Sequence, residues 1–84
     1  MKWIVRAEYV KDYQVKVAFN DGKQALINFE PLLTGEIFAP LKEIDYFRKF
    51  RLHSELDVII WPNGADFSPD YLYEVAQSQS KVPA

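Results

Sequence analysis

The stretch from Val58 to Tyr73, VIIWPNGADFSPDYLY, contains the signals for a strand, a turn and a helix in succession. Residues 58–61 are β-branched aliphatic residues closed by an aromatic one, a run typical of a strand buried on both faces. Pro62 removes a backbone donor from the ladder, and Asn63-Gly64 is a pair that tolerates positive φ. The stretch therefore predicts a strand that ends at Trp61 and a turn that follows it.

A helix is predicted soon after this turn. Ser68 is a good N-cap residue, Pro69 fits the first helical position, and Asp70 places a negative charge at the positive end of the helix dipole. We expect the helix to run from Pro69 to about Gln77. The side chains expected to face the core are Leu72, Val75 and Ala76.

The composition is that of one small globular domain. Of the 84 residues, 49% are hydrophobic and 15% are aromatic, which is enough for one two-layer core and too much for a disordered chain. We assign residues 1–77 to this domain. Residues 78–84, which include Ser, Gln, Lys and Pro, are expected to form a flexible tail.

Cysteine content and charge limit the possible partners. The chain has no cysteine, so it forms neither a disulfide nor a thiolate metal site. No apolar run approaches the ~18 residues of a membrane span, and we expect a soluble cytoplasmic protein without membrane contact. The formal net charge is −2, and the cations are dispersed among the acids, which disfavours direct nucleic-acid binding.

Three strands are predicted before residue 30. In the first, residues 3–9, one face carries Trp3, Val5, Ala7 and Tyr9, and the other carries Ile4, Arg6 and Glu8. Residues 13–19 and 23–29 form a hairpin. We favour a three-residue loop, Asn20-Asp21-Gly22, with Gly22 in the left-handed conformation, because this register pairs Val15 with Ile27 on one face. A two-residue turn would mix polar and apolar side chains on both faces.

Short elements are predicted in the middle of the chain. Residues 30–35 resemble one helical turn with Pro near its start and Gly after its end, and residues 36–41 are apolar without a clear period. A short helix is predicted over 43–49, and a brief strand over 51–53 pairs with 58–61. The predicted fold class is α+β, with a small antiparallel sheet of about five strands, short helices in the middle and one C-terminal helix.

Several of these residues are spaced as in a known bacterial family. The run Trp61-Pro62-Asn63-Gly64-Ala65-Asp66, followed by Pro69, Tyr71 and Leu72, resembles the family called domain of unknown function 2442 (DUF2442), over about residues 3–74. The resemblance implies an α+β domain with a small antiparallel sheet, no established activity, and membership of two-protein, toxin–antitoxin-like pairs. Some similar proteins add a helix-turn-helix domain, which is not expected here because only a short tail follows.

Asn63 and Asp66 form the most suggestive polar pair, because they follow a buried strand where side chains could converge on a ligand. Asn and Asp beside Gly also commonly bond local backbone to fix a turn, and we favour this structural role. Trp61 could anchor an interface, but in so small a domain we expect it in the core.

The other polar residues give no pattern of a catalytic or metal site. His53 is the only histidine, so neither a catalytic triad nor a multi-histidine metal site can be built. Residues 47–51, FRKFR, could contact RNA. We favour a helix end whose cations complement the dipole while Phe47 and Phe50 pack inward. We therefore expect no enzymatic activity, no cofactor and no metal.

These observations favour a protein-interaction module, the antitoxin-like or regulatory half of a two-protein pair. Its partner would be a small protein or a second copy of the chain. It would bind at the surface formed by residues 61–73 or at an unpaired sheet edge. The candidate protein-binding residues are Trp61, Asn63, Asp66, Asp70, Tyr71 and Tyr73. The alternatives are a nucleic-acid-associated regulator that uses the basic cluster, and a small-ligand binder or enzyme that uses Asn63 and Asp66.

Overall fold

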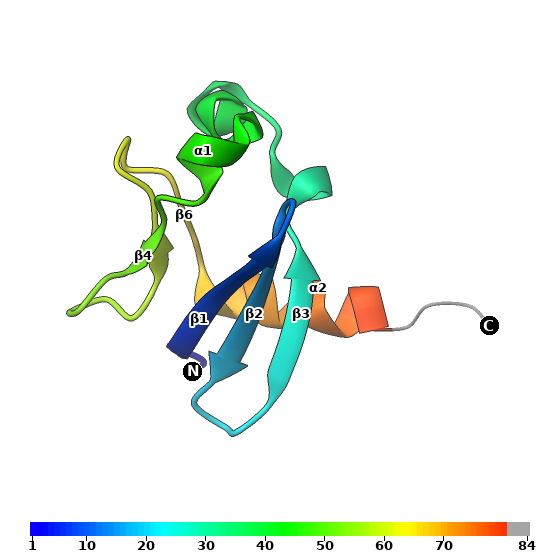
Figure 1. Ribbon diagram of the computed structural model, residues 1–84. Helices are drawn as coiled ribbons and strands as arrows, with labels where there is room; N and C mark the ends of the chain where they lie inside the picture. The colour runs from blue at the N-terminus through cyan, green and yellow to red at the C-terminus, as the bar shows by residue number, and fades with distance from the viewer. Residues whose placement is uncertain (81–84) are drawn as a thin grey trace.

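The structure is a computed structural model that describes residues 1–80. It has two antiparallel three-stranded sheets, with short helices between them in the sequence and one C-terminal helix (Figure 1). The elements are β1 (Ile4–Lys11), β2 (Gln14–Phe19), β3 (Gln24–Asn28), the 3-10 helices η1 (Glu30–Leu32) and η2 (Glu36–Lys42), α1 (Ile44–Phe47), β4 (Arg51–Leu52), β5 (Ile59–Ile60), β6 (Asp66–Phe67) and α2 (Pro69–Ser80). The predicted α+β class is confirmed.

The strands form two sheets, not one. The larger has the order β1-β2-β3 and the smaller the order β4-β5-β6, and the two approach each other where β4 lies near β1. The N–H of Ile4 donates to the carbonyl of Asp57 (3.2 Å), but no ladder continues this bond within residues 1–80. The strands of the two sheets therefore remain separate, and the prediction of a single sheet is corrected.

The register of the β2–β3 hairpin is the predicted one. Val15 lies opposite Ile27 and Val17 opposite Ala25, and the N–H of Phe19 donates to the carbonyl of Lys23 across the three-residue loop (2.8 Å). Gly22 has a φ of +90°, a conformation that glycine adopts without steric cost. The choice of a three-residue loop, made by matching the apolar faces of the two strands, is therefore confirmed.

The predicted faces of β1 are wrong, because a β-bulge interrupts the alternation. Between the pairs Ile4–Phe19 and Arg6–Ala18 the register shifts, which leaves Val5 as an extra residue. Ile4 is consequently fully buried, with Ala7 packed against the same core, whereas Val5 is 52% exposed. A bulge moves later side chains to the opposite face, which a strict period of two cannot anticipate.

The middle segment contains one element that periodicity missed. The turn expected over 30–35 is η1, and the helix expected over 43–49 is the shorter α1. The apolar run at 36–41 forms the 3-10 helix η2. In such a helix side chains repeat every three residues, so Phe38 and Leu41 both face the core, although a period of 3.6 is not apparent.

The stretch from Val58 to Tyr73 forms the β5–β6 hairpin and the start of α2. The strand predicted over 58–61 is limited to Ile59–Ile60, and only Ile59 is fully buried within it. The turn closes as the N–H of Trp61 donates to the carbonyl of Ala65 (2.9 Å), and β6 was not predicted. Pairing on both sides of β5 makes it the central strand of the smaller sheet.

Helix α2 begins as predicted and ends later. Pro69 is its first residue, and the N–H of Tyr71 donates to Oγ of the N-cap Ser68 (3.4 Å). Leu72 is fully buried, with Val75 and Ala76 packed against the core. The helix continues to Ser80, so the first part of the expected tail is helical; residues 81–84 lie outside the described residues.

Candidate functional site

Trp61 lies in the core. Its side chain is 2% exposed, and its indole N–H donates to the carbonyl of Phe47 (2.8 Å). Four aromatic rings surround it at centroid distances of 5.7 to 6.1 Å: Phe29, Phe47, Phe50 and Phe67. In this conformation Trp61 offers no surface to a partner and supports the fold from inside.

Asn63 fixes the turn between β5 and β6. Its Oδ1 accepts the N–H of Ala65 (3.1 Å) and its Nδ2 donates to the carbonyl of Ile37 (2.9 Å), which ties the turn to η2. Asp66 is exposed and faces Ile60 in the register; no hydrogen bond or ion pair of its side chain occurs within residues 1–80. Neither side chain lines any of the three hollows described below.

Asp70 and Tyr71 lie at the start of α2. Oδ1 of Asp70 accepts the backbone N–H of Lys2 (3.1 Å), which joins the helix to the N-terminal segment. The ring of Tyr71 stacks on Phe67 at 6.1 Å, and its side chain is 45% exposed. Asp70 thus has a structural contact, and Tyr71 presents an aromatic surface to solvent.

Tyr73 connects α2 to the β2–β3 loop. Its O–H donates to Oδ2 of Asp21 (2.7 Å), and Nζ of Lys2 donates to the same oxygen (3.0 Å). The backbone N–H of Lys23 donates to the other carboxylate oxygen (3.0 Å). Lys23, then Tyr73 and Lys2, lower the pKa of Asp21 below its ordinary value by these hydrogen bonds. The same carboxylate raises the pKa of Lys2.

The basic cluster 47–51 lies at the end of α1 and beyond it; the helix ends at Phe47, and its last turn contains no basic residue, unlike the prediction. Phe47 is buried and Phe50 packs against the core. The guanidinium of Arg48 lies 4.8 Å over the ring of Tyr9, an arrangement that cation–π attraction stabilises. The aromatic residues of the cluster therefore serve the core and do not form a stacking surface for bases.

The described residues show no arrangement for metal binding. No group of three or more His, Asp or Glu side chains within residues 1–80 is placed to hold an ion. Nδ1 of His53 accepts the N–H groups of Glu55 and Leu56, both at 3.1 Å, and so stabilises the β4–β5 turn. In the same part of the chain, no helix has the length and apolar character needed to cross a membrane.

The outer strands of the larger sheet differ as binding edges. β1 has register shifts at Val5 and Val10, and β4 lies against it. Bulges and covering segments are the usual protection of an edge against further pairing. β3 pairs with β2 without a shift, and its five residues, QALIN, contain no charge and no proline. Figure 1 shows β3 at the edge of the sheet opposite to β1.

The hydrogen-bond pattern shows which β3 groups face outward. The N–H of Phe29 donates to the carbonyl of Tyr13 (2.8 Å). The backbone N–H and C=O groups of the odd-numbered residues of β3 are therefore the ones that bond β2. In an antiparallel ladder the residues between them direct N–H and C=O to the other side. These residues are Gln24, Leu26 and Asn28.

Gln79 occupies one end of this edge. Its side-chain Oε1 accepts the N–H of Asn28 (2.9 Å) and its Nε2 donates to the carbonyl of the same residue (2.8 Å). The carboxamide thus bonds Asn28 as a neighbouring strand would. For Gln24 and Leu26, no partner of the outward-facing backbone groups occurs among residues 1–80, and Leu26 is 53% exposed.

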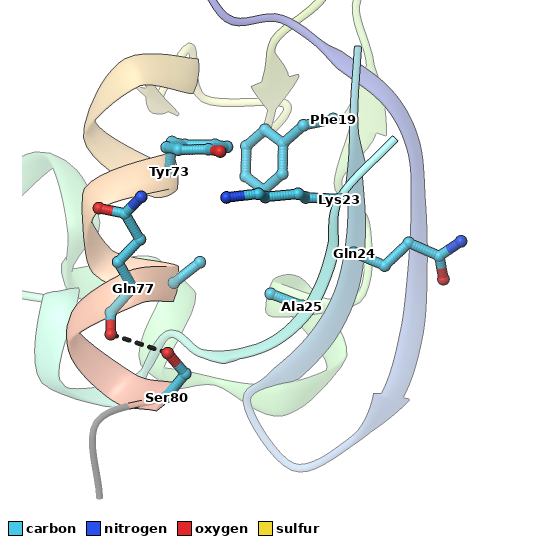
Figure 2. A pocket seen from close by; sticks show the side chains of 8 residues that line it. Phe19, Lys23, Gln24, Ala25, Tyr73, Gln77 and Ser80 are labelled. Carbon is cyan, nitrogen blue, oxygen red and sulfur yellow. Dashed lines mark hydrogen bonds between the residues drawn. The ribbon is translucent and has the colours of Figure 1, made fainter. Parts of the chain in front are cut away.

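Two hollows flank the open part of the edge. The inner one, about 180 Å³, lies between the hairpin and α2 (Figure 2) and is lined by Phe19, Lys23, Gln24, Ala25, Tyr73, Ala76, Gln77 and Ser80. The outer one is lined by Val10, Lys16, Gln24, Ala25 and Leu26. Of the residues proposed from sequence, only Tyr73 belongs to this region. A third hollow, lined by Tyr13, Glu30, Pro31, Leu33, Thr34 and Lys42, shares no lining residue with the other two.

Sequence reasoning did not find Gln24, Leu26 or Gln79. The predicted hairpin register already implied that Gln24 and Leu26 direct their backbone groups away from β2. Which strand lies at the edge, and what covers it, depends on contacts between residues 51 positions apart, such as Asn28 and Gln79. No local pattern in the sequence reports such a contact.

Fold and site together define a small α+β domain whose larger sheet has an open edge, at β3, beside the C-terminal helix. The sequence model of the family described as "Protein of unknown function (DUF2442)" matches residues 4–78, and the chain belongs to this family. The resemblance noted from the motifs is thereby confirmed. No matching curated protein was found, nor any matching solved structure.

Proposed function

We propose that this protein is an interaction module that binds an extended segment of a small protein partner along the open edge of β3. It acts by binding and not by catalysis, as the antitoxin-like or regulatory half of a two-protein pair in the cytoplasm. The observation that carries this proposal is the outward-facing backbone of Gln24 and Leu26, on a strand without bulges, charges or proline.

The energetics of strand addition fit a specific but modest contact. The N–H and C=O groups of Gln24 and Leu26 allow up to four backbone hydrogen bonds, each with a net value of about 0.5–1.5 kcal/mol. Ordering a flexible partner segment costs roughly 2–5 kcal/mol. Backbone bonding alone therefore gives little surplus, and side-chain contacts in the flanking hollows must supply the affinity and the specificity.

Other functions have less support from the described residues. Asn63 uses both ends of its carboxamide in structural bonds, which disfavours the ligand-binding and enzymatic alternative. Arg48 lies over Tyr9, and the aromatic residues beside it are turned inward, which disfavours the nucleic-acid alternative. The antitoxin-like role is supported by the family resemblance alone.

The test is a pull-down from the native cells with Leu26→Pro and Leu26→Thr. Both variants lose the leucine side chain, but only proline removes the outward N–H, and it leaves the β2–β3 ladder intact. We expect proline to abolish recovery of the partner and threonine to retain it in part. Circular dichroism and thermal melts confirm that both variants fold. Equal recovery with both variants would exclude the β3 edge as the contact.

A further inference from the structure

We propose that the segment paired with β3 has an apolar–acidic–apolar pattern, and that its acidic side chain enters the hollow between β3 and α2. This inference rests on the proposed function, because it specifies the chemistry of the partner at the same edge. It follows from the alternation of side chains in a sheet, from the size of the inner hollow, and from the absence of an ion pair between Lys23 and any carboxylate of residues 1–80.

The alternation determines which partner residue meets the hollow. Lys23 and Ala25 point toward α2, whereas Gln24 points away from it (Figure 2). In a paired strand the residue opposite Ala25 directs its side chain to the same side as Ala25. One partner side chain therefore enters the inner hollow, and its two neighbours lie on the outer face beside Gln24 and Leu26.

The inner hollow has room for one side chain. Its volume is about 180 Å³, below the roughly 300–1,000 Å³ typical of small-molecule pockets. Its wall combines the methyl groups of Ala25 and Ala76 with Gln77 and Ser80; the hydroxyl of Ser80 already donates to the backbone carbonyl of Gln77 (2.9 Å). A short aliphatic stem matches the methyl groups, and an acceptor at its end would find its donors in Lys23 and the carboxamide of Gln77.

Charge selects an acid for this position. Lys23 is the charged residue that lines the hollow; its Nζ lies 5.5 Å from the ring centroid of Tyr73, and it has no carboxylate within 4.0 Å among residues 1–80. The nearby Asp21 is paired with Lys2 and accepts from Tyr73 and from the backbone N–H of Lys23, and it forms no ion pair with the ammonium of Lys23. An incoming carboxylate would give this ammonium its counterion.

The outer face requires apolar neighbours. Leu26 is 53% exposed and lines the outer hollow with Val10 and the stem of Lys16. Aliphatic side chains on both sides of the acid would cover this surface. A second copy of the chain, paired about Ala25, would bring only Gln24, Ala25 and Leu26 to the edge and would leave Lys23 without a carboxylate.

The experiment uses cyclised hairpin peptides whose exposed strand reads Val-Glu-Val, Val-Gln-Val or Val-Lys-Val. Binding is measured by fluorescence anisotropy up to millimolar peptide, with hydrogen exchange at the amides of Gln24 and Leu26. We expect the Glu peptide to bind about 3- to 10-fold more tightly than the Gln peptide and to protect both amides. Lys23→Glu should reverse this order in favour of the Lys peptide. Lys11→Glu makes the same charge change on β1 and should alter affinity less than about twofold.

The outcomes separate this inference from the proposed function. If Leu26→Pro abolishes binding of all peptides while Lys23→Glu leaves their order unchanged, strand addition stands and the acidic partner is excluded. If Leu26→Pro has no effect, or no peptide binds, both are overturned for this edge. A dimer seen by sedimentation that dissociates in Leu26→Pro and excludes the peptide would show that the occupant is a second copy.

Discussion

Two regions of the molecule are held together by different kinds of contact: the core around Trp61, called here the Trp61 end, and the contact of the β2–β3 hairpin with α2, called the β3–α2 end. At the Trp61 end, aromatic rings bury the tryptophan, and its indole N–H donates to the buried carbonyl of Phe47. At the β3–α2 end, the half-buried carboxamide of Gln79 and the carboxylate of Asp21 join the helix to the hairpin beside one aromatic contact, Phe19 with Tyr73. The sequence drew attention to the first end because turns and aromatics are conspicuous, yet the open backbone lies at the second.

This difference has an energetic basis. Burial of large apolar side chains contributes several kcal/mol per residue, whereas exposed ion pairs and single hydrogen bonds contribute about 1 kcal/mol or less. The Trp61 end should therefore resist local opening, and the β3–α2 end should be the part that can accommodate a partner. Four variants test this contrast, ordered from the largest expected effect to the smallest.

Trp61→Ala should unfold the domain or nearly so. Removal of a buried tryptophan typically costs about 3–5 kcal/mol, which is comparable to the whole stability of a domain of this size. Urea unfolding monitored by circular dichroism measures the loss. Trp3→Ala is the matched control, because Trp3 is 43% exposed and its truncation should change stability by less than about 1 kcal/mol. Similar losses from both would contradict the assignment of Trp61 to the core.

Asn63→Ala should cost about 1–2 kcal/mol, because it removes the turn-fixing acceptor and the bond to the carbonyl of Ile37. Asn63→Asp restores the acceptor for the N–H of Ala65 but not the donor for Ile37, so its loss should be intermediate. Thermal melts of the three proteins measure the order. An Asn63→Ala variant as stable as the parent would show that the turn is held by other contacts.

Gln79→Ala should cost only about 0.5–1 kcal/mol, since both lost bonds are near the surface. The sharper readout is hydrogen exchange at the amide of Asn28, which should accelerate while the amide of Trp61 remains protected. Gln79→Glu keeps an acceptor for the Asn28 N–H and should preserve part of its protection. Unchanged exchange in Gln79→Ala would mean that the carboxamide does not cover the edge.

Asp21→Asn should chiefly change the pH dependence of stability. The pKa of Asp21 is lowered in the folded state, so its contribution is present above the unfolded value of about 3.9 and is lost as pH falls toward the folded value. The parent should exceed the variant in stability at pH 7, and the difference should shrink between about pH 4 and pH 2.

Urea midpoints at these pH values measure the difference. Asp66→Asn, at the Trp61 end, removes a carboxylate that has no bonding partner among residues 1–80. This control should follow the pH profile of the parent. If Asp21→Asn also followed the parent, the network of Asp21 with Lys2 and Tyr73 would have no net effect on stability.

The elements that the sequence predicted well are those specified by neighbouring residues. The three-residue loop before Lys23 followed from matching apolar faces, and the start of α2 followed from Ser68 and Pro69. Two of the errors share one physical cause. The bulge at Val5 and the strand β6 depend on pairing with residues distant in sequence, and tertiary contacts decided them against the local pattern.

The sequence by itself determined the α+β class, the β2–β3 register, the helix start and the family, because hydrophobic period, turn residues and capping residues act over a few positions. Only the tertiary structure decided that the strands form two sheets, and that β3 is left open except at Asn28, where Gln79 covers it. An exposed edge is defined by what packs beside it, and that depends on the path of the whole chain.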